Sequence, residues 1–169
     1  MITDTKYYQY MIENIKVSKT SKLNDQTKVQ VLDLWNTEYP KNLSHSNSTD
    51  FDDYLGKLTN PMHYLLLNES DLILGWAFTF DRDDERWFAI ILSEKIKGRG
   101  IGKKMLNEIK CDESILNGWV IDHNNDLKQN GQYYLSPLKF YEKCGFEVLP
   151  DIRLNLEMIS AVKIRWERN

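Results

Sequence analysis

Residues 92–104 read Leu-Ser-Glu-Lys-Ile-Lys-Gly-Arg-Gly-Ile-Gly-Lys-Lys and decide the fold. They join residues 86–92, rich in the aromatic and β-branched types that strands favour, to a segment whose apolar residues recur at helical spacing. Gly98, Gly100 and Gly102 fall on the first turn of that helix. Glycine lets the backbone curl there, and the unpaired N–H groups of a helix start attract phosphate. The stretch therefore predicts an anion-binding junction between a strand and a helix.

Two well-known phosphate-binding motifs do not fit the spacing of these glycines. A P-loop needs four residues between its first glycine and a Gly-Lys pair followed by Ser or Thr, whereas Gly98 and Gly102 are separated by three residues. The dinucleotide fingerprint G-x-G-x-x-G needs glycine at position 103, which is lysine. The spacing favours neither a nucleotide hydrolase nor a dehydrogenase.

The glycine stretch resembles the pyrophosphate loop of the GNAT superfamily of N-acetyltransferases, whose motif is Gln/Arg-x-x-Gly-x-Gly/Ala. Residues 97–102 read Lys-Gly-Arg-Gly-Ile-Gly, so that Lys97 stands where the family has Gln or Arg. Residues 136–146, Ser-Pro-Leu-Lys-Phe-Tyr-Glu-Lys-Cys-Gly-Phe, resemble the second recurrent element of the family, a short helix with Phe-Tyr-Glu-Lys-x-Gly-Phe. Ser136 can cap this helix, with Pro137 in its first position. The two motifs cover roughly the C-terminal half of the chain.

Periodicity along the rest of the chain predicts the other elements. Residues 1–13 show no clear period. The expected helices begin at Asn24 or Asp25 and at residue 50, ending before Pro40 and at Asn60-Pro61. The expected strands are 14–18, 63–68, 72–80, 85–92, 118–122 and two C-terminal strands, and residues 124–132 form a polar insertion. This order resembles the GNAT fold, an α/β (α+β) fold with a mixed, mostly antiparallel central sheet, flanking helices and a splayed cofactor cleft.

Length and composition restrict the class of protein. The chain has 169 residues, 41% of them hydrophobic, which suits one domain over residues 1–169. With 22 basic and 25 acidic residues and a net charge of −3, no nucleic-acid surface is expected. Apolar runs of signal-peptide or membrane-spanning length are absent from the sequence, which favours a cytoplasmic protein without a membrane partner. Cys111 and Cys144 suggest free thiols rather than a disulfide framework or a zinc site.

The resemblance implies acetyl-CoA as cofactor. Backbone N–H groups of residues 98–103 would hold its diphosphate, with Arg99, Lys103 and Lys104 adding positive charge. The strand before the loop would pair with the pantetheine arm. The residues expected to contact the cofactor are Leu92, Ser93, Lys97, Gly98, Arg99, Gly100, Ile101, Gly102, Lys103 and Tyr141.

The resemblance also assigns catalytic roles. The N–H of Leu92 would face the thioester carbonyl, and the phenol of Tyr141 would protonate the leaving thiolate. The alternatives are an ordinary strand end for Leu92 and a packing role for Tyr141. Glu85 and Asp122, at strand ends that could open toward the cleft, are candidates to remove the proton of the acceptor ammonium, with a solvated or salt-bridged role as the alternative.

Three further features bear on the acceptor. The family often has asparagine seven residues before the tyrosine, where this chain has Tyr134. Glu38 and Tyr39 fall where the family shapes its acceptor pocket, or else pack at a helix end. Residues 81–86 form an acidic tip that could attract a cationic substrate or lie solvated in a hairpin.

We therefore expect an acetyl-CoA-dependent N-acetyltransferase that acts on a primary amine of a small molecule by direct attack in a ternary complex. A protein lysine or N-terminus is the alternative acceptor. A coenzyme A-binding domain without catalysis, serving as a sensor or interaction module, is the alternative of a different class. A homodimer is possible, and the sequence does not define the oligomeric state.

Overall fold

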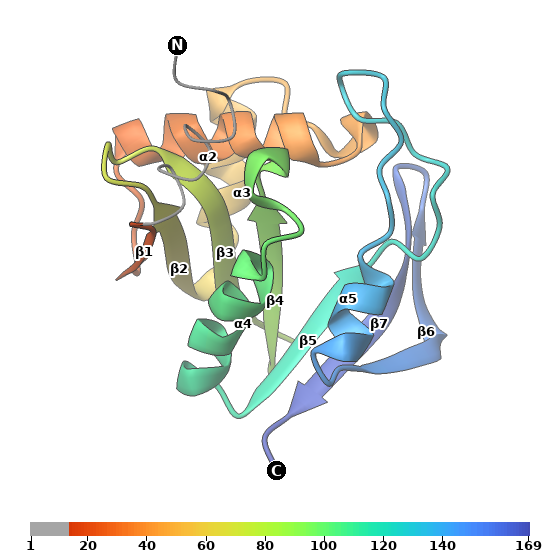
Figure 1. Cartoon of the computed structure of the whole chain (residues 1–169). Helices are drawn as coiled ribbons and strands as arrows, with labels where there is room; N and C mark the ends of the chain where they lie inside the picture. Colours follow the sequence, from red (N-terminus) through yellow and green to blue (C-terminus); the bar gives the residue numbers. More distant parts are fainter. Residues whose placement is uncertain (1–13) are drawn as a thin grey trace.

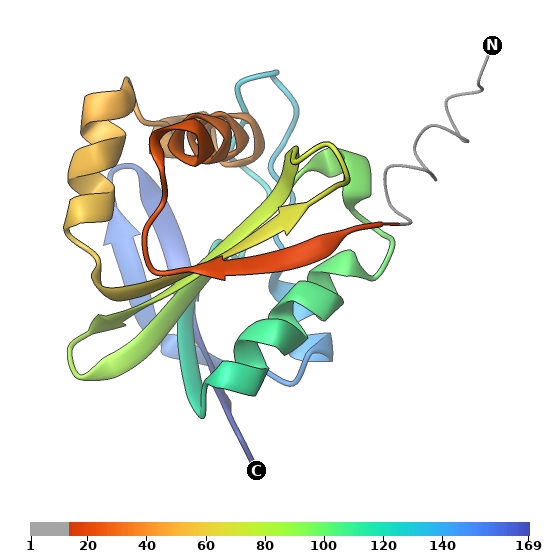
Figure 2. The same cartoon turned by 90° about the vertical axis from the view of Figure 1, so that its left-hand side faces the viewer.

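The chain forms one seven-stranded mixed sheet with helices on both faces, as a computed structural model describes it for residues 14–169 (Figures 1 and 2). The strand order is β1-β2-β3-β4-β5-β7-β6. All neighbours pair antiparallel except β4 and β5, which are parallel. The predicted mixed, mostly antiparallel α+β fold is confirmed. The segment 1–13, without a clear period, lies outside the described residues.

The elements follow the chain in the order that the sequence predicts. The strands are β1 Lys16–Thr20, β2 Thr59–Leu67, β3 Ile73–Arg82, β4 Glu85–Leu92, β5 Ile115–Val120, β6 Glu147–Leu156 and β7 Ile159–Glu167. The α-helices are α2 Asp25–Glu38, α3 Ser48–Gly56, α4 Ile101–Asp112 and α5 Leu138–Lys143, with short 3-10 helices at Lys41–Leu43 and Glu94–Ile96. Asparagine side chains set two helix starts, because Asn24 accepts from the N–H of Thr27 and Asn47 from that of Asp50.

Two differences from the predicted boundaries involve prolines. Pro61 lies inside β2 rather than between elements. It is tolerated because β1 pairs with β2 only as far as His63, so no β1 strand lies beside Pro61, and the β2–β3 register shifts between Thr59 and Met62. Pro137 is the N-cap of α5 rather than its first residue, while the Ser136 hydroxyl accepts from the N–H of Leu138 at 3.2 Å.

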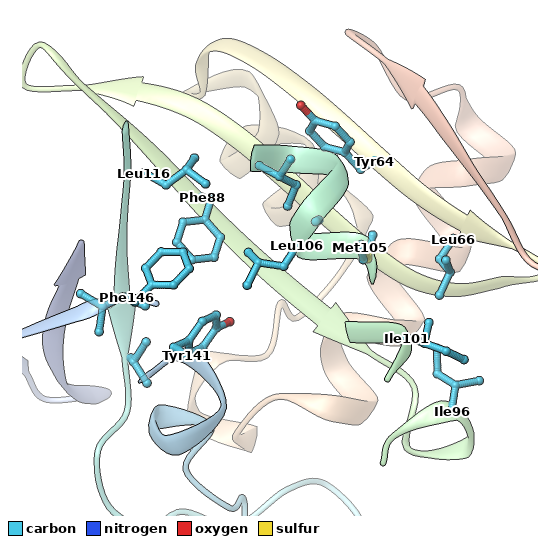
Figure 3. Close-up of a cluster of buried hydrophobic side chains, with 14 of the residues drawn as sticks. Tyr64, Leu66, Phe88, Ile96, Ile101, Met105, Leu106, Leu116, Tyr141 and Phe146 are labelled. Atoms are coloured by element: carbon cyan, nitrogen blue, oxygen red, sulfur yellow. The ribbon is translucent and has the colours of Figure 1, made fainter. Parts of the chain in front are cut away.

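The sheet separates two cores. Helices α2 and α3 cover one face, where Trp35, Phe51 and Trp76 are buried (Figure 2). Helices α4 and α5 cover the other face, and Figure 3 shows Met105 and Leu106 from α4 near Tyr141 from α5 in this second core. The β4–β5 boundary, between the two parts of the sheet, is thus bordered by a separate core on each face.

Strands β4 and β5 are joined at one end and diverge toward the other (Figure 1). Trp87 and Asn117 are the one residue pair in register between them among the described residues. The buried Asn117 side chain strengthens this end, because its Nδ2 donates to the carbonyl of Arg86 at 3.1 Å. Beyond Trp87, the β5 side of β4 lacks a strand partner in the described chain. The splay predicted from the resemblance is therefore present.

Candidate active site

The glycine loop opens helix α4 with free backbone donors. Gly98 and Gly100 have φ angles of +75° and +76°, in the left-handed region where side chains are strained, and a Cβ at either would meet no atom within 4 Å. Gly100 caps the helix without a side-chain hydrogen bond. The N–H groups of Ile101, Gly102 and Lys103 have no intrahelical acceptor because they belong to the first turn. This open, positively polarised helix end fits a diphosphate.

Gly102 has a different purpose in the loop. A Cβ on Gly102 would lie 2.9 Å from Leu92 Cδ1 and 3.3 Å from Phe140 Cζ, so a larger residue would force these side chains apart. The glycine therefore lets the start of α4 pack directly on the end of β4 and on α5. It brings together the three segments that carry the sequence motifs.

The backbone of β4 alternates between its two neighbours. The Ser93 N–H donates to the Leu74 carbonyl on the β3 side at 2.9 Å, whereas the Arg86 carbonyl accepts from Asn117 of β5. Every second residue of β4 counted from Arg86 therefore directs its backbone N–H and C=O groups toward β5. This places the backbone groups of Ile90 and Leu92 in the splay, while Ser93 is already paired with β3.

A cavity of about 270 Å³ lies at this splay. Phe88, Ile90 and Tyr141 line it and belong to the α4/α5 core. Trp35, Trp87 and Trp119 also line it and belong to the α2/α3 core. The cavity, called here the β4–β5 cavity, therefore has walls from both faces of the sheet, so that ligands approaching from opposite faces could meet in it.

Tyr141 brings a phenol to the cavity from α5. Its side chain is 7% exposed and packs edge-on against Phe88 and Phe146, with ring centres 5.8 Å and 5.6 Å away. Figure 3 shows the hydroxyl directed away from Phe146. Burial raises the pKa of Tyr141 well above its usual value, so the phenol keeps its proton at neutral pH. It can act as a proton donor and not as a base.

Comparisons with known proteins agree with this geometry. The family model for the acetyltransferase (GNAT) domain matches residues 60–148, more than half of the chain. The chain belongs to the GNAT acetyltransferase family. By sequence, none of the curated proteins matches it.

Solved acetyltransferases share the fold over nearly the whole chain. An aminoglycoside 6'-N-acetyltransferase crystallised with coenzyme A aligns with a TM-score of 0.65 and 14% identity, covering 90% of this chain and 96% of its own. A GNAT acetyltransferase of Staphylococcus aureus Mu50 aligns with a TM-score of 0.63 and 13% identity, covering 91% and 100%. The spermidine/spermine N-acetyltransferase of Vibrio cholerae aligns with a TM-score of 0.60 and 11% identity, covering 93% and 94%. At these identities the likeness establishes the fold alone.

Acetyl-CoA is the cofactor of this acetyltransferase family. The open glycine loop, the free N–H groups at the start of α4 and the unpaired β5 side of β4 suit its diphosphate and its amide-bearing arm. Among the described residues, no helix is long and apolar enough to span a membrane.

The two carboxylates expected to act as base do not line the β4–β5 cavity, which corrects that expectation. Glu85 lies at the opposite end of β4 from Leu92 and accepts from Lys163 at 2.7 Å and Arg165 at 2.8 Å. The hydrogen bond from Lys163 lowers the pKa of Glu85. Asp122 accepts two hydrogen bonds of 2.9 Å from Arg153, which lower its pKa. Both serve as ion-pair partners.

The acidic tip is a tight hairpin between β3 and β4. Asp83 and Asp84 occupy its turn with φ angles of 51° and 57°, as a two-residue turn of this kind requires. The Asp81 carboxylate accepts from Asn60 and Arg86, which leaves little of its charge for a cationic substrate. The tip is therefore mainly structural, and the expected attraction of a cation is not supported by its hydrogen bonds.

Lys97 and Glu38 meet in a charged network behind the cofactor loop. The Glu38 carboxylate, 5% exposed, accepts from the Glu94 N–H at 2.8 Å and from Lys128 Nζ at 3.0 Å. Lys97 Nζ lies 3.0 Å from Glu94 Oε2 and 3.7 Å from Glu38 Oε2. Lys97 thus contacts acidic side chains that hold the loop, and Glu38 anchors the loop to α2 instead of lining the acceptor pocket.

The polar insertion after β5 closes one side of the cavity. It is held to the end of α2, where the Lys41 N–H donates to the Leu127 carbonyl at 2.8 Å. Just after it, Tyr134 lines the cavity together with Tyr39, and their ring centres are 6.2 Å apart. Burial raises the pKa of both phenols. Tyr134, in the place of the family's asparagine, is therefore a wall of the acceptor side.

Sequence reasoning missed several cavity residues. Ile90 could have been found, because it lies two residues before Leu92 in β4 and its backbone groups face the same side of the strand. Trp35 and Tyr54 stand one helical turn from Tyr39 and Phe51, a spacing that equally predicts core packing. Arg82 gave no signal beyond its place in the acidic tip.

Proposed function

We propose that this protein is an N-acetyltransferase that transfers the acetyl group of acetyl-CoA to a primary amine of a small molecule, by direct attack in a ternary complex. The observation that carries the proposal is the β4–β5 cavity, whose walls come from both faces of the sheet. An arrangement of this kind lets a cofactor from the α4 face and an acceptor from the α2/α3 face meet at one point. Bound acetyl-CoA supplies the activated acetyl group as a thioester.

The cofactor is held by the residues around the glycine loop. Backbone N–H groups of residues 98–103 bind the diphosphate, and the exposed Arg99 and Lys103 add charge. Gly98, Gly100 and Gly102 give the loop its shape, with Ile101 buried beneath it and Lys97 tied to Glu94. Ser93 fixes the strand end against β3. A homodimer stays a proposal, which light scattering after size-exclusion chromatography tests.

Two groups support the transfer itself. The Leu92 N–H, directed into the splay, donates to the carbonyl oxygen as negative charge develops there, a contact worth about 3 kcal/mol in other acyl-transfer enzymes. The Tyr141 phenol, kept protonated by burial, holds the proton that the departing sulfur requires. Since neither a carboxylate nor a histidine is among the described residues of the cavity wall, the acceptor amine gives up its own proton to water before attack.

An amine panel tests this function. Purified protein is mixed with acetyl-CoA and aromatic monoamines, polyamines, aminoglycosides or a lysine peptide, and released thiol is measured. We expect release with at least one small amine and a rate that rises with pH toward the pKa of that amine. Release with the peptide alone would transfer the assignment to a protein acceptor.

A non-catalytic coenzyme A-binding module is favoured by one observation, the engagement of both Glu85 and Asp122 in ion pairs. Thermal stabilisation by acetyl-CoA without thiol release from any amine would support that module. Absence of stabilisation would instead contradict the cofactor site of this chain.

A further inference from the structure

The acceptor side of the β4–β5 cavity has an unusual charge. Its walls on the α2/α3 face are aromatic and include Trp35, Tyr39, Tyr54, Phe80, Trp87 and Trp119. Among the described residues that line the cavity, Arg82 alone carries a formal charge. A site built for a polycationic amine would present carboxylates, because opposite charges recognise such ligands. This wall presents a cation instead.

Arg82 is positioned over the aromatic wall and has no carboxylate partner. Its guanidinium carbon lies 5.0 Å from the ring centre of Phe80 and 5.4 Å from that of Trp87. Within residues 14–169, no ion pair of 4 Å or less involves Arg82, whereas Arg86 and Arg153 are both paired. Stacking on two rings fixes the planar guanidinium while leaving its N–H donors available.

The acidic residues beside Arg82 do not supply that partner. Asp81 accepts hydrogen bonds from Arg86 and Asn60, and Glu85 from Lys163 and Arg165. Asp83 and Asp84 are exposed in the hairpin turn, where they line a second hollow together with Arg82, but they do not line the β4–β5 cavity and neither forms an ion pair with Arg82 within 4 Å. The charge of Arg82 is therefore available to a ligand.

Trp87 provides a second, independent observation. Its side chain is 4% exposed and lines the cavity, yet its indole Nε1 is buried without a hydrogen-bond acceptor among the described residues. A buried donor without a partner is costly, so such groups call for an explanation, and a ligand that supplies the missing acceptor is one. A bound oxygen anion on Arg82, which stacks over the Trp87 ring, would supply an acceptor close to this indole.

We infer that the acceptor amine carries an anionic group, a carboxylate or another oxygen anion, which Arg82 and the Trp87 indole N–H bind. The inference rests on the proposed function and specifies its substrate class. Along β4, Trp87 precedes Ile90, the cavity residue nearest in sequence to Leu92, by three residues, roughly 10 Å of extended strand. The anionic group therefore lies at the end of the acceptor remote from its amine, with an apolar or aromatic body between them that packs against the tryptophans. Such a substrate differs in charge from spermidine and from an aminoglycoside.

Matched acceptors test the inference through thiol release. The probes are 4-(2-aminoethyl)benzoic acid, its methyl ester and spermidine, each with acetyl-CoA. We expect a kcat/KM for the acid roughly tenfold above that of the ester, a difference of about 1.4 kcal/mol, because only the acid offers Arg82 a charge-assisted hydrogen bond. Added salt should reduce the preference.

Single substitutions show which side chain causes the preference for the acid over the ester. Arg82→Gln should abolish the preference for the acid, while Arg82→Lys should retain part of it. Arg153→Gln is the matched control, since Arg153 pairs with Asp122 outside the cavity wall. Equal rates for the acid and ester in the unmodified protein, or a preference that survives Arg82→Gln, would overturn the inference while leaving the proposed function in place.

A binding measurement distinguishes failure of the anion-site inference from failure of the proposed function. Three cavity tryptophans, Trp35, Trp87 and Trp119, report ligand binding through their fluorescence. If no amine releases thiol, the proposed function fails, and titration of the same acid and ester into the coenzyme A complex still decides the anion site. Tighter binding of the acid, lost in Arg82→Gln, supports it; equal affinities, or no binding of either probe, contradict it.

Discussion

Tyr141 is the side chain on which the proposed proton transfer depends most. Its phenol lies at the β4–β5 cavity, and burial raises its pKa, so it stays protonated through the neutral range. We expect Tyr141→Phe to lower kcat by about 100-fold, the usual contribution of a general acid, because the departing sulfur loses its proton donor. The ring and its packing remain, so the dissociation constant for coenzyme A should be unchanged. Steady-state kinetics and calorimetric titration measure the two quantities.

The matched control is Tyr133→Phe. Tyr133 lies in the loop before α5 and is 63% exposed, and the described cavity wall does not include it. Its phenol should be dispensable, with kcat within twofold of the original. If Tyr141→Phe behaved in the same way, Tyr141 would be a packing residue, the alternative that the sequence left open.

His63 makes stability depend on pH. It is 4% exposed, its Nδ1 accepts from Trp76 Nε1 at 3.3 Å, and burial lowers its pKa from 6.5 to about 4. The unfolded chain therefore binds the proton more readily, so the free energy of unfolding falls as the pH drops from about 6.5 toward 4. The loss amounts to up to about 3 kcal/mol. Urea unfolding at pH 7 and pH 5 measures how much the free energy of unfolding falls, and this fall should be clearly smaller in His63→Gln than in the original protein. An equal fall in both would mean that other titrating groups cause it.

Single residues also mark the limit of prediction from sequence. The glycines at the start of α4 and the helix that carries Tyr141 could be placed, because each motif records a local backbone requirement. Glu85 and Asp122 could not, because their partners Lys163 and Arg153 come from distant strands. A carboxylate at a strand end looks the same in sequence whether it faces a cavity or an ion pair.

Among the elements, the start of α4 depends on the left-handed backbone of Gly100. Gly100→Ala has two possible outcomes. The loop keeps the left-handed conformation, and the free energy of unfolding falls by about 1 kcal/mol, or the backbone at residue 100 changes to another conformation. In the second case coenzyme A must restore the loop, and its dissociation constant should rise by about tenfold. Urea unfolding and calorimetry distinguish these results.

Gly56→Ala is the control, because Gly56 ends α3 without a positive φ and has open space around its Cβ position. Both measurements should stay near their original values in this control. If Gly100→Ala also changed neither stability nor affinity, the glycine loop would not be the shaped cradle that the proposed function requires.

The cofactor loop, α2 and the polar insertion are tied together by the Glu38–Lys128 pair. Both side chains are buried, with Nζ and Oε2 3.0 Å apart. Lys128→Met should lower the free energy of unfolding by about 3 kcal/mol, because it leaves a buried carboxylate without its main partner. The double variant Glu38→Gln with Lys128→Met should recover much of this loss, since the charge is gone and the amide oxygen can still accept from Glu94. Urea unfolding measures both.

Lys95→Met serves as the control for the loss of a lysine, since Lys95 is exposed in the same loop as Glu94. It should change the unfolding free energy by less than about 0.5 kcal/mol. A double variant no more stable than Lys128→Met would mean that the lost packing of the lysine stem, and not the buried charge, is responsible.

Most elements could be predicted because their signals are local. β4 was placed at its observed bounds by an apolar run between the aspartates of a turn and the glycine loop. The start of β2 was missed because a proline normally ends an element, and Pro61 is tolerated only through the position of β1. The aromatic wall was missed for the same kind of reason, since it combines α2, β4 and the insertion and exists only in the folded chain.

At the scale of the whole molecule, the sheet consists of two parts, β1–β4 and β5–β7, joined in register at Trp87 and Asn117. A ligand between β4 and β5 contacts both parts and binds only when they are assembled. Acetyl-CoA at 100 times its dissociation constant should therefore raise the free energy of unfolding by about 2.7 kcal/mol. Each further tenfold increase should add about 1.4 kcal/mol. Thermal unfolding over a concentration series measures this dependence, with adenosine, which lacks the diphosphate and the arm, as the matched ligand. A series without any rise, or the same rise with adenosine, would contradict a site that spans the splay.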